Sequence, residues 1–436
     1  MISVRKILSF LNGVATVIKM LAGLVSVKVV AAAIGPTGIA LLGQLNSFST
    51  IILGVSNGGI NAGITKYTAE YADSPRKYQL FLGTSFWITI FLSVLTGLIL
   101  ILFAGYFSET ILQSKEYKPV FYAFGCTVSL YALNALLISV MNGFREFRKY
   151  VLANIIASIL GLIFAVVLAR LYGTMGALIG VVTYQSVVFF ITVALVWNAP
   201  WFTFTAITKV FSKTVAKKLG GYSLMALVSA ILMPASQIYI RDYISQTNGL
   251  AEAGLWESVN KISIMYLMVV TTSLSVYFLP KLTELKTNLA LQKEIFQVYK
   301  LLLPFLLIST IRFLLIKILY TPEFLAMDKF FIYQLPGDIF KMAGWVLGYV
   351  MIAKSMTKTY IFFEFVSAGA QVLFCTWAIQ QFGSIGGAIG YSAGHLLYFL
   401  CMVFLFRKIL FSQHKTKAIH DITISTGIHY NARLQR

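Results

Sequence analysis

Apolar stretches long enough to cross a bilayer, about 20 residues each, recur along the whole chain. Hydrophobic residues make up 58% of the 436 positions and charged residues only 11%, whereas a soluble domain is about 25% charged. So few polar groups cannot cover a water-soluble fold of this size. The runs are also longer than the alternating segments of about ten residues that build transmembrane β-barrels. The sequence therefore predicts an all-α polytopic membrane protein.

The length of the chain accommodates about 12 transmembrane helices, at roughly 36 residues for each span with its connection. Charged residues, glycines and prolines separate the apolar runs. They place the spans at about 8–34, 38–65, 80–107, 118–141, 150–171, 175–198, 219–241, 253–279, 296–320, 329–353, 358–379 and 385–407.

The net charge is +20, from 35 Lys and Arg against 15 Asp and Glu. In a soluble protein this excess would suggest nucleic acid. Here the basic residues gather in alternate loops, as the positive-inside rule requires, so we expect no nucleic-acid partner. The pattern predicts that both termini lie in the cytoplasm and that the number of spans is even. Cys126, Cys375 and Cys401 lie in apolar runs and show no disulfide or metal-ligand spacing.

An internal repeat relates the two halves of the chain. Tyr172-Gly-Thr-Met-Gly-Ala-Leu-Ile-Gly180 matches Phe382-Gly-Ser-Ile-Gly-Gly-Ala-Ile-Gly390, and each segment opens the last span of its half. Lys66-Tyr-Thr-Ala-Glu70 similarly matches Lys281-Leu-Thr-Glu284. Since each half holds an even number of spans, we expect a parallel repeat about an axis along the membrane normal, the usual plan of alternating-access transporters.

The repeat predicts two pseudo-symmetric six-helix lobes around a central cavity. We expect an N-lobe at 1–198, a cytoplasmic linker at 199–218, a C-lobe at 219–409 and a basic cytoplasmic tail at 410–436.

Signals of catalysis are weak. The chain has no metalloprotease, P-loop or Cys-x-x-Cys motif, and His395 is the only histidine within a span. The predicted external loops are too short to hold the active site of a membrane polymerase or ligase. We therefore expect a protein that is not an enzyme, with no catalytic residues, metal or cofactor.

Ionisable residues at membrane depth are the candidate functional groups, because charges there are costly and usually face a bundle interior or a wet cavity. The bases are Lys19, Lys28, Lys261, Arg312 and Lys341, and the acids are Glu257, Asp338 and Glu364. Helical spacing allows the pairs Asp338–Lys341 and Glu257–Lys261. Polar stripes that only hold helices together are the alternative interpretation. Because the balance is positive, the cavity favours an anion such as a pyrophosphate group.

Six segments spread over the chain resemble one family. They are Lys28-Val-Val-Ala-Ala-Ala-Ile-Gly-Pro-Thr-Gly38, Gly63-Ile-Thr-Lys-Tyr-Thr-Ala-Glu-Tyr71, Met141-Asn-Gly-Phe-Arg-Glu146, Trp256-Glu-Ser-Val, Ser275-Val-Tyr-Phe-Leu-Pro280 and Tyr333-Gln-Leu-Pro-Gly-Asp338. The chain resembles the O-antigen translocases, the Wzx-type lipid-linked oligosaccharide flippases, and in particular their lipid III flippase branch. These proteins belong to the multidrug/oligosaccharidyl-lipid/polysaccharide exporter superfamily.

The resemblance implies two six-helix lobes that move an undecaprenyl-pyrophosphate-linked oligosaccharide across a bacterial inner membrane. By motif it places Lys28, Lys66, Arg145 and Arg241 among the residues that hold the pyrophosphate, while Lys261 rests on composition alone. The full expectation for the cationic cavity is Lys19, Lys28, Lys66, Arg145, Arg241, Lys261, Arg312 and Lys341. The expected ion-pair or coupling residues are Glu257, Asp338, Glu364 and His395.

Two other functions stay open at this point. One is a cation-coupled drug antiporter of the same superfamily, against which the absence of an acid in the first span counts. The other is a membrane polymerase or ligase. For a flippase we expect a monomer in the inner membrane, H⁺ or Na⁺ as a coupling ion, and other membrane proteins of polysaccharide assembly as partners.

Overall fold

The computed structural model describes residues 2–202, 211–285, 287–302, 308–354 and 356–411, and almost all of these residues lie in α-helices. The first half of the chain forms α1 (Ile2–Ser56), α2 (Asn61–Tyr71), α3 (Pro75–Leu102), α4 (Ala104–Leu112), η1 (Lys115–Tyr117), α5 (Lys118–Gly143) and α6 (Phe147–Val196). The second half forms α8 (Lys213–Asn248), α9 (Leu250–Ser273), η2 (Leu274–Phe278), α10 (Leu279–Glu284), α11 (Asn288–Leu302), α12 (Ile308–Leu319), η4 (Pro322–Met327), α13 (Asp328–Ala353), α14 (Thr357–Phe382), η5 (Gly383–Ile385), α15 (Gly386–Leu405) and α16 (Arg407–Leu410). The predicted all-α fold is confirmed.

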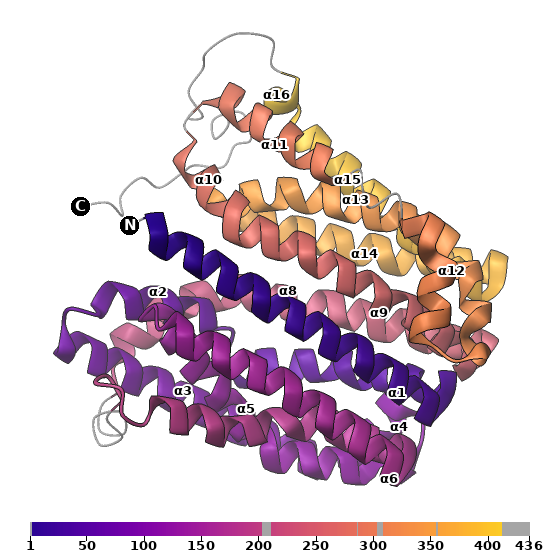
Figure 1. Cartoon of the computed structure of the whole chain (residues 1–436), viewed down its shortest axis with the longest axis horizontal. Helices are drawn as coiled ribbons and strands as arrows, with labels where there is room; N and C mark the ends of the chain where they lie inside the picture. Colours follow the sequence, from indigo (N-terminus) through magenta and orange to yellow (C-terminus); the bar gives the residue numbers. More distant parts are fainter. Residues whose placement is uncertain (1, 203–210, 286, 303–307, 355, 412–436) are drawn as a thin grey trace.

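The two longest helices are each broken by one glycine. As straight rods, α1 and α6 would be about 75–83 Å long, well beyond a bilayer. Gly35 (φ 64°) in α1 and Gly173 (φ 58°) in α6 have positive φ and non-helical backbone angles. Glycine adopts this left-handed region without the steric penalty that other residues meet. In Figure 1, α1 runs from the left end of the molecule to the right and then turns back.

The predicted repeat extends to the geometry of the turns. Gly383, 210 positions after Gly173, also has a positive φ of 64° and joins α14 to α15. A Cβ on Gly176 would lie 1.9 Å from the carbonyl oxygen of Leu168, and a Cβ on Gly386 would lie 2.1 Å from that of Ala378. The two contacts therefore join equivalent positions of two helical hairpins. In both hairpins only glycine lets the two helices approach so closely.

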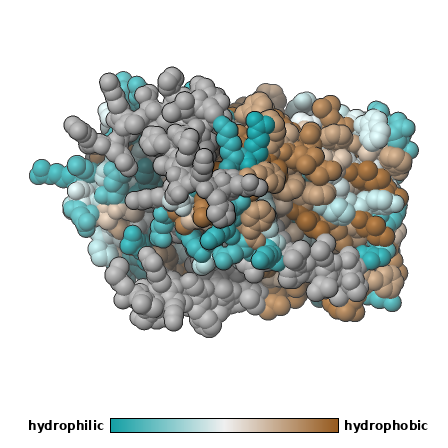
Figure 2. All heavy atoms as spheres, turned by 90° about the horizontal axis from the view of Figure 1, so that it is seen from above, coloured by the Kyte–Doolittle hydropathy of each residue, from teal (hydrophilic) through white to brown (hydrophobic). Residues whose placement is uncertain are grey.

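The described part of the chain contains six stretches that are long and apolar enough to cross a membrane. They are Lys19–Ser56, Pro75–Leu102, Lys115–Gly143, Phe147–Val196, Ser223–Asn248 and Thr357–Leu405. Gly35, Gly173 and Gly383 break three of them, and the expected count of about 12 spans stays a prediction. In Figure 2 hydrophobic residues form a broad band over the right half of the visible face, and hydrophilic residues gather toward the left. A membrane protein presents such a band to lipid.

The helices form two lobes, seen as the lower (α1–α6) and upper (α9–α16) parts of Figure 1. The turn between α8 and α9 meets the turn between α14 and α15, where a Cβ on Gly383 would lie 3.2 Å from Nδ2 of Asn248, and it meets the break of α1, where a Cβ on Gly254 would contact Pro36; following the charge pattern we name this end the predicted outer end. The opposite end carries α2, α10 and α16 and is named the predicted inner end.

Three hydrophobic cores hold this arrangement together. One core contains buried residues of both lobes from helix segments near the predicted outer end, including Leu45, Phe121, Leu178, Trp256 and Phe330. A second core contains only C-lobe residues, such as Phe278, Ile295 and Val346. The third is built chiefly from N-lobe residues, such as Ile64, Phe81 and Val140. The lobes therefore share one core toward the predicted outer end and have separate cores toward the inner end.

The boundaries around the predicted linker differ from the expectation. The helix expected from 219 begins at Lys213, where the Ser212 hydroxyl accepts a hydrogen bond from the Val215 amide at 3.5 Å. Serine is a favoured helix N-cap, and this cap extends the helix by nearly two turns. Val215 and Leu219 pack on the N-lobe core, so the start of α8 lies against the N-lobe. Residues 203–210 of the expected linker and 412–436 of the expected tail lie outside the described residues.

Candidate functional site

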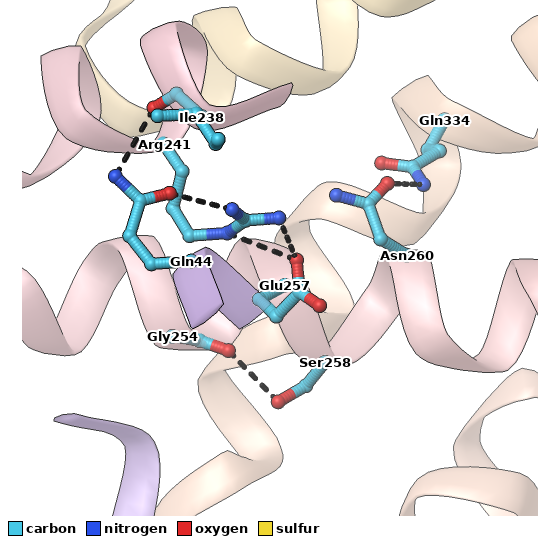
Figure 3. Close-up of polar contacts among 8 residues, drawn as sticks. All are labelled: Gln44, Ile238, Arg241, Gly254, Glu257, Ser258, Asn260 and Gln334. Carbon is cyan, nitrogen blue, oxygen red and sulfur yellow. Dashed lines mark hydrogen bonds and ion pairs between the residues drawn. The ribbon is translucent and has the colours of Figure 1, made fainter. Parts of the chain in front are cut away.

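A buried polar cluster joins the lobes near the predicted outer end (Figure 3). Arg241 on α8 donates from Nε (3.0 Å) and Nη2 (2.6 Å) to Oε2 of Glu257 on α9. Its Nη1 donates to Oε1 of Gln44 on α1 at 2.7 Å, and Nε2 of Gln44 donates to the carbonyl of Ile238 at 3.2 Å. Arg241 is 3% exposed. The guanidinium is therefore committed to protein partners in this conformation.

Small residues make room for this cluster. A Cβ on Gly43 would lie 2.4 Å from Cδ of Glu257, so the carboxylate side chain occupies the space that the glycine leaves. A Cβ on Gly254 would lie 1.8 Å from the carbonyl oxygen of Pro36. The two lobes thus approach to backbone contact here. The indole ring of Trp256 covers the guanidinium of Arg241 at 5.9 Å, a cation–π arrangement.

A second polar cluster lies inside the C-lobe, around Asp338 on α13. Its Oδ2 accepts hydrogen bonds from the hydroxyls of Ser263 (2.8 Å) and Tyr266 on α9, and its Oδ1 accepts one from Tyr391 on α15 at 2.8 Å. Nζ of Lys341 donates to the Tyr391 hydroxyl at 3.1 Å. Asp338 is 1% exposed. Three helices of one lobe therefore meet at a single carboxylate.

Neither of the two pairs that helical spacing allows makes a direct ion pair within 4.0 Å among the described residues. Asp338 and Lys341 make no ion pair within 4.0 Å, because the Tyr391 hydroxyl lies between them and the ammonium lies over the rings of Tyr391 and Trp345. Glu257 pairs with Arg241 rather than with Lys261. In both cases a side chain from another helix reaches the carboxylate.

Lys261 is the free base beside the lobe interface. It is half-buried on α9, one turn beyond Glu257 on the same face. Within the described part of the chain it makes no hydrogen bond or ion pair. One further turn along, Met265 faces Gly23 of α1, whose added Cβ would lie 3.7 Å from the Met265 methyl group. The face of α9 that carries Lys261 therefore borders α1.

Lys19 and Lys28 of α1 are exposed. Lys19 lies one turn before Gly23 on the face that borders α9, and Lys28 is also exposed, further toward the predicted outer end. Lys19 and Lys261 thus lie on either side of the Gly23–Met265 contact. The structure brings these two bases toward one interface, and it does not place Lys28 in either buried cluster.

Lys66 and Arg145 lie near the predicted inner end, away from both clusters. Lys66 is exposed on α2, with its ammonium 5.4 Å from the Tyr67 ring. Arg145 is exposed in the α5–α6 turn with a positive φ of 58°. The two segments are adjacent, since the Thr65 hydroxyl donates to the carbonyl of Ser139 at 3.1 Å. These exposed bases therefore lie apart from the two buried clusters.

The remaining candidates lie in the C-lobe. Nε of Arg312 donates to Oδ1 of Asp328 at 2.9 Å. Glu364 is half-buried and interacts with the hydroxyls of Tyr360 and Ser229. His395 is 2% exposed and its ring contacts that of Tyr391, at 4.4 Å between centroids.

Sequence reasoning missed the amide and hydroxyl partners. Gln44 and Asn46 interrupt a run that is otherwise apolar up to that point, and this interruption was the available signal. Ser263 and Tyr266 gave no signal in the sequence, because single serines and tyrosines are ordinary in membrane helices.

Comparisons with known proteins show which family the chain belongs to. The family model described as polysaccharide biosynthesis protein matches residues 7–286. The lipid III flippases of Escherichia coli (strain K12) and Shigella flexneri are each 29% identical to the chain over 404 residues, which is 91% of this chain and 97% of theirs.

Solved structures share the fold. An inward-facing multidrug resistance MATE family transporter of the MOP superfamily superposes with a TM-score of 0.72 at 12% identity, over 91% of this chain and 96% of the transporter. The lipid II flippase MurJ, in an inward closed conformation, gives 0.65 at 14% identity, over 93% and 90%. The family model covers well over half of the residues, so the chain belongs to the polysaccharide biosynthesis protein family, as the sequence motifs predicted.

Proposed function

We propose that the protein is a flippase that moves an undecaprenyl-pyrophosphate-linked oligosaccharide from the inner to the outer leaflet of a bacterial inner membrane. The observation that carries the proposal is the similarity to lipid III flippases over nearly their whole length. The repeat unit is of the O-antigen or enterobacterial common antigen type. The lipid tail stays in the bilayer while the head group passes between the lobes.

The pyrophosphate needs a cation that the protein has not already neutralised. Arg241, Lys341 and Arg312 are held by protein groups in this conformation. Lys261 is free, and Lys19 lies exposed across the same interface. We therefore assign the first contact with the pyrophosphate to Lys261 and Lys19, with Lys28 and Arg241 available once the lobes move. A lysine suits this role, because its ammonium is a mobile point charge with three donors.

Transport proceeds by rocking of the lobes. Separate cores at the predicted inner end and one shared core at the outer end support an inward-open resting state. Lys66 and Arg145 attract the anionic head group from the cytoplasm, where both termini lie. Cysteines at Ile34 and Gln246, near the outer ends of α1 and α8, should cross-link in one state only. Full transport with the lobes locked together would rule out rocking in favour of a static groove.

The proposed reaction makes and breaks no covalent bond, so the protein is not an enzyme and needs no cofactor. Coupling to H⁺ or Na⁺ is assigned to three groups of the C-lobe: the buried Asp338 and His395 and the half-buried Glu364. The protein acts as a monomer beside other membrane proteins of polysaccharide assembly.

The test is reconstitution of the purified protein in vesicles with a polyprenyl-pyrophosphate-linked saccharide that carries a fluorophore. We expect the fraction of fluorophore quenched from one side to rise from about half to nearly all. Lys261→Ala should slow this change, and Lys408→Ala, which removes a base at the predicted inner end, serves as the matched control. Transport of a cationic dye without movement of the lipid would instead favour the antiporter. Elongation of the saccharide would favour a polymerase.

A further inference from the structure

Two glutamines of the N-lobe hold the same helix of the C-lobe near the predicted outer end. Gln44 uses both ends of its amide: Nε2 donates to the carbonyl of Ile238, and Oε1 accepts from Arg241. Gln113, which follows α4, does the same: Nε2 donates to Oδ1 of Asp242 at 2.9 Å, and Oε1 accepts from the Ser245 hydroxyl at 3.1 Å. Each amide spans one turn of α8, and the two turns are consecutive.

The backbone of Gln113 gives an independent reason to single out this residue. Its φ is 55°, and in the described part of the chain only Arg145 shares a positive φ among the residues other than glycine. Glycine would adopt this conformation without strain. Gln113 is the C-cap of α4, and its backbone N–H donates to the carbonyl of Ser108, so the surrounding structure holds the left-handed conformation. Here the left-handed turn directs the amide of Gln113 across to α8.

The charges near these contacts lie on one side of the interface. Arg241 and Glu257 both belong to the C-lobe, on α8 and α9, so their ion pair can survive separation of the lobes. On separation the two neutral amides leave their partners, and the charged partners keep a bond within the C-lobe, Arg241 to Glu257 and Asp242 to Gln246. Water can replace hydrogen bonds of neutral groups at little net loss, whereas parting a buried ion pair leaves a charge without compensation. The interface is therefore built to open and close again.

We propose that Gln44 and Gln113 form an amide clasp whose release is the step that opens the lobes at the predicted outer end. The inference rests on the proposed alternation of the lobes, and it assigns a role to residues outside the cationic site. The clasp sets the balance between the outward-closed and outward-open states.

The test measures the distance between the lobes directly. Spin labels are placed at Glu116 of the N-lobe and Ala251 of the C-lobe, both exposed, in full-length protein whose three cysteines are replaced by alanine. The protein is held in lipid nanodiscs without substrate, and double electron–electron resonance gives the distribution of distances.

We expect Gln44→Met combined with Gln113→Gly to raise the ratio of long to short distances about tenfold. Gln113→Gly also relieves the backbone strain, so thermal stability should be kept. The matched control is Gln246→Met, because Nε2 of Gln246 donates at 2.7 Å to Asp242 on its own helix. This control should leave the distribution unchanged.

A second variant tests whether the distance measurement can detect separation of the lobes. Gly254→Ala puts a methyl group against the Pro36 carbonyl and should push the lobes apart by steric contact alone. If Gly254→Ala lengthens the distances and the double glutamine variant does not, backbone packing closes the lobes and the clasp proposal is wrong. If the glutamine variants lengthen them while the unsubstituted protein flips no lipid-linked saccharide, the clasp stands and the proposed function fails.

Discussion

The two buried polar clusters contain similar residues, but one joins the two lobes and the other lies within one lobe. The Arg241–Glu257 cluster is completed by Gln44 from the other lobe. The Asp338 cluster is completed entirely within the C-lobe, by α9 and α15. The first therefore has a part that changes during lobe movement, and the second keeps three helices of one rigid body together.

The difference shows how buried charges can be compatible with movement of the lobes. In both clusters each charge finds its main partner within one lobe, so lobe movement does not strand it. Among the described residues Lys261 differs from these charges, since it is half-buried and makes no direct hydrogen bond or ion pair. A position of that kind suits a ligand that brings its own negative charge.

The largest effect should follow from breaking the ion pair of the first cluster. Arg241→Met leaves Glu257 buried without compensation, which we expect to lower the free energy of unfolding by about 3–5 kcal/mol. Abundance in the membrane and thermal unfolding in detergent measure this loss. Arg241→Met with Glu257→Met should recover abundance. Normal abundance of the single variant would mean that the pair is not buried in the membrane.

The second cluster should respond less, because no charge in it is paired directly. Asp338→Asn weakens three hydrogen bonds to a carboxylate and leaves Lys341 without a nearby negative charge, for a loss of about 1.5–3 kcal/mol. Adding Lys341→Met should restore the yield. If Asp338→Asn instead keeps normal abundance and abolishes transport, the cluster binds or couples rather than supports the lobe.

Removing the charge of Lys261 should leave the stability of the protein unchanged and should slow transport. We expect Lys261→Gln to keep normal abundance and to reduce flipping at limiting substrate about tenfold, or about 1.4 kcal/mol of binding free energy. Lys261→Arg should retain most of the activity. The comparison variant is Lys28→Gln, which removes an exposed base of α1 outside both clusters and should have a smaller effect. Equal losses would show that position along the interface does not matter.

The smallest effect concerns the two hairpins of the repeat. Gly173→Ala meets no neighbouring atom, so its loss of about 1 kcal/mol reflects only the positive φ. Gly383→Ala has the same φ penalty, and its Cβ would also lie 3.2 Å from Nδ2 of Asn248. Thermal unfolding of the two variants should therefore differ slightly, with Gly383→Ala the less stable. The reverse order would contradict the equivalence of the hairpins.

The fold was predictable because its determinants are local. Long apolar runs fix the helices, and Gly173 and Gly383 recur within the same short motif. The clusters were only partly predictable. Gln44 and Arg241 are 197 positions apart, and no local pattern pairs them. The detail of the Asp338–Lys341 pair was hidden for a related reason: helical spacing brings the two side chains near each other, but the Tyr391 hydroxyl from a distant span lies between them.

The Arg241–Glu257 pair also bears on how the chain enters the membrane during synthesis. The two residues are 16 positions apart, with the turn at Gly249 midway between them. Each charge alone would oppose insertion of its helix by about 2.5–3.5 kcal/mol. If α8 and α9 leave the translocation channel together as a hairpin, the charges meet before either helix faces lipid. In that case the two charges enter the membrane as a neutral ion pair, and the hairpin does not need the Gln44 amide of the N-lobe to neutralise it.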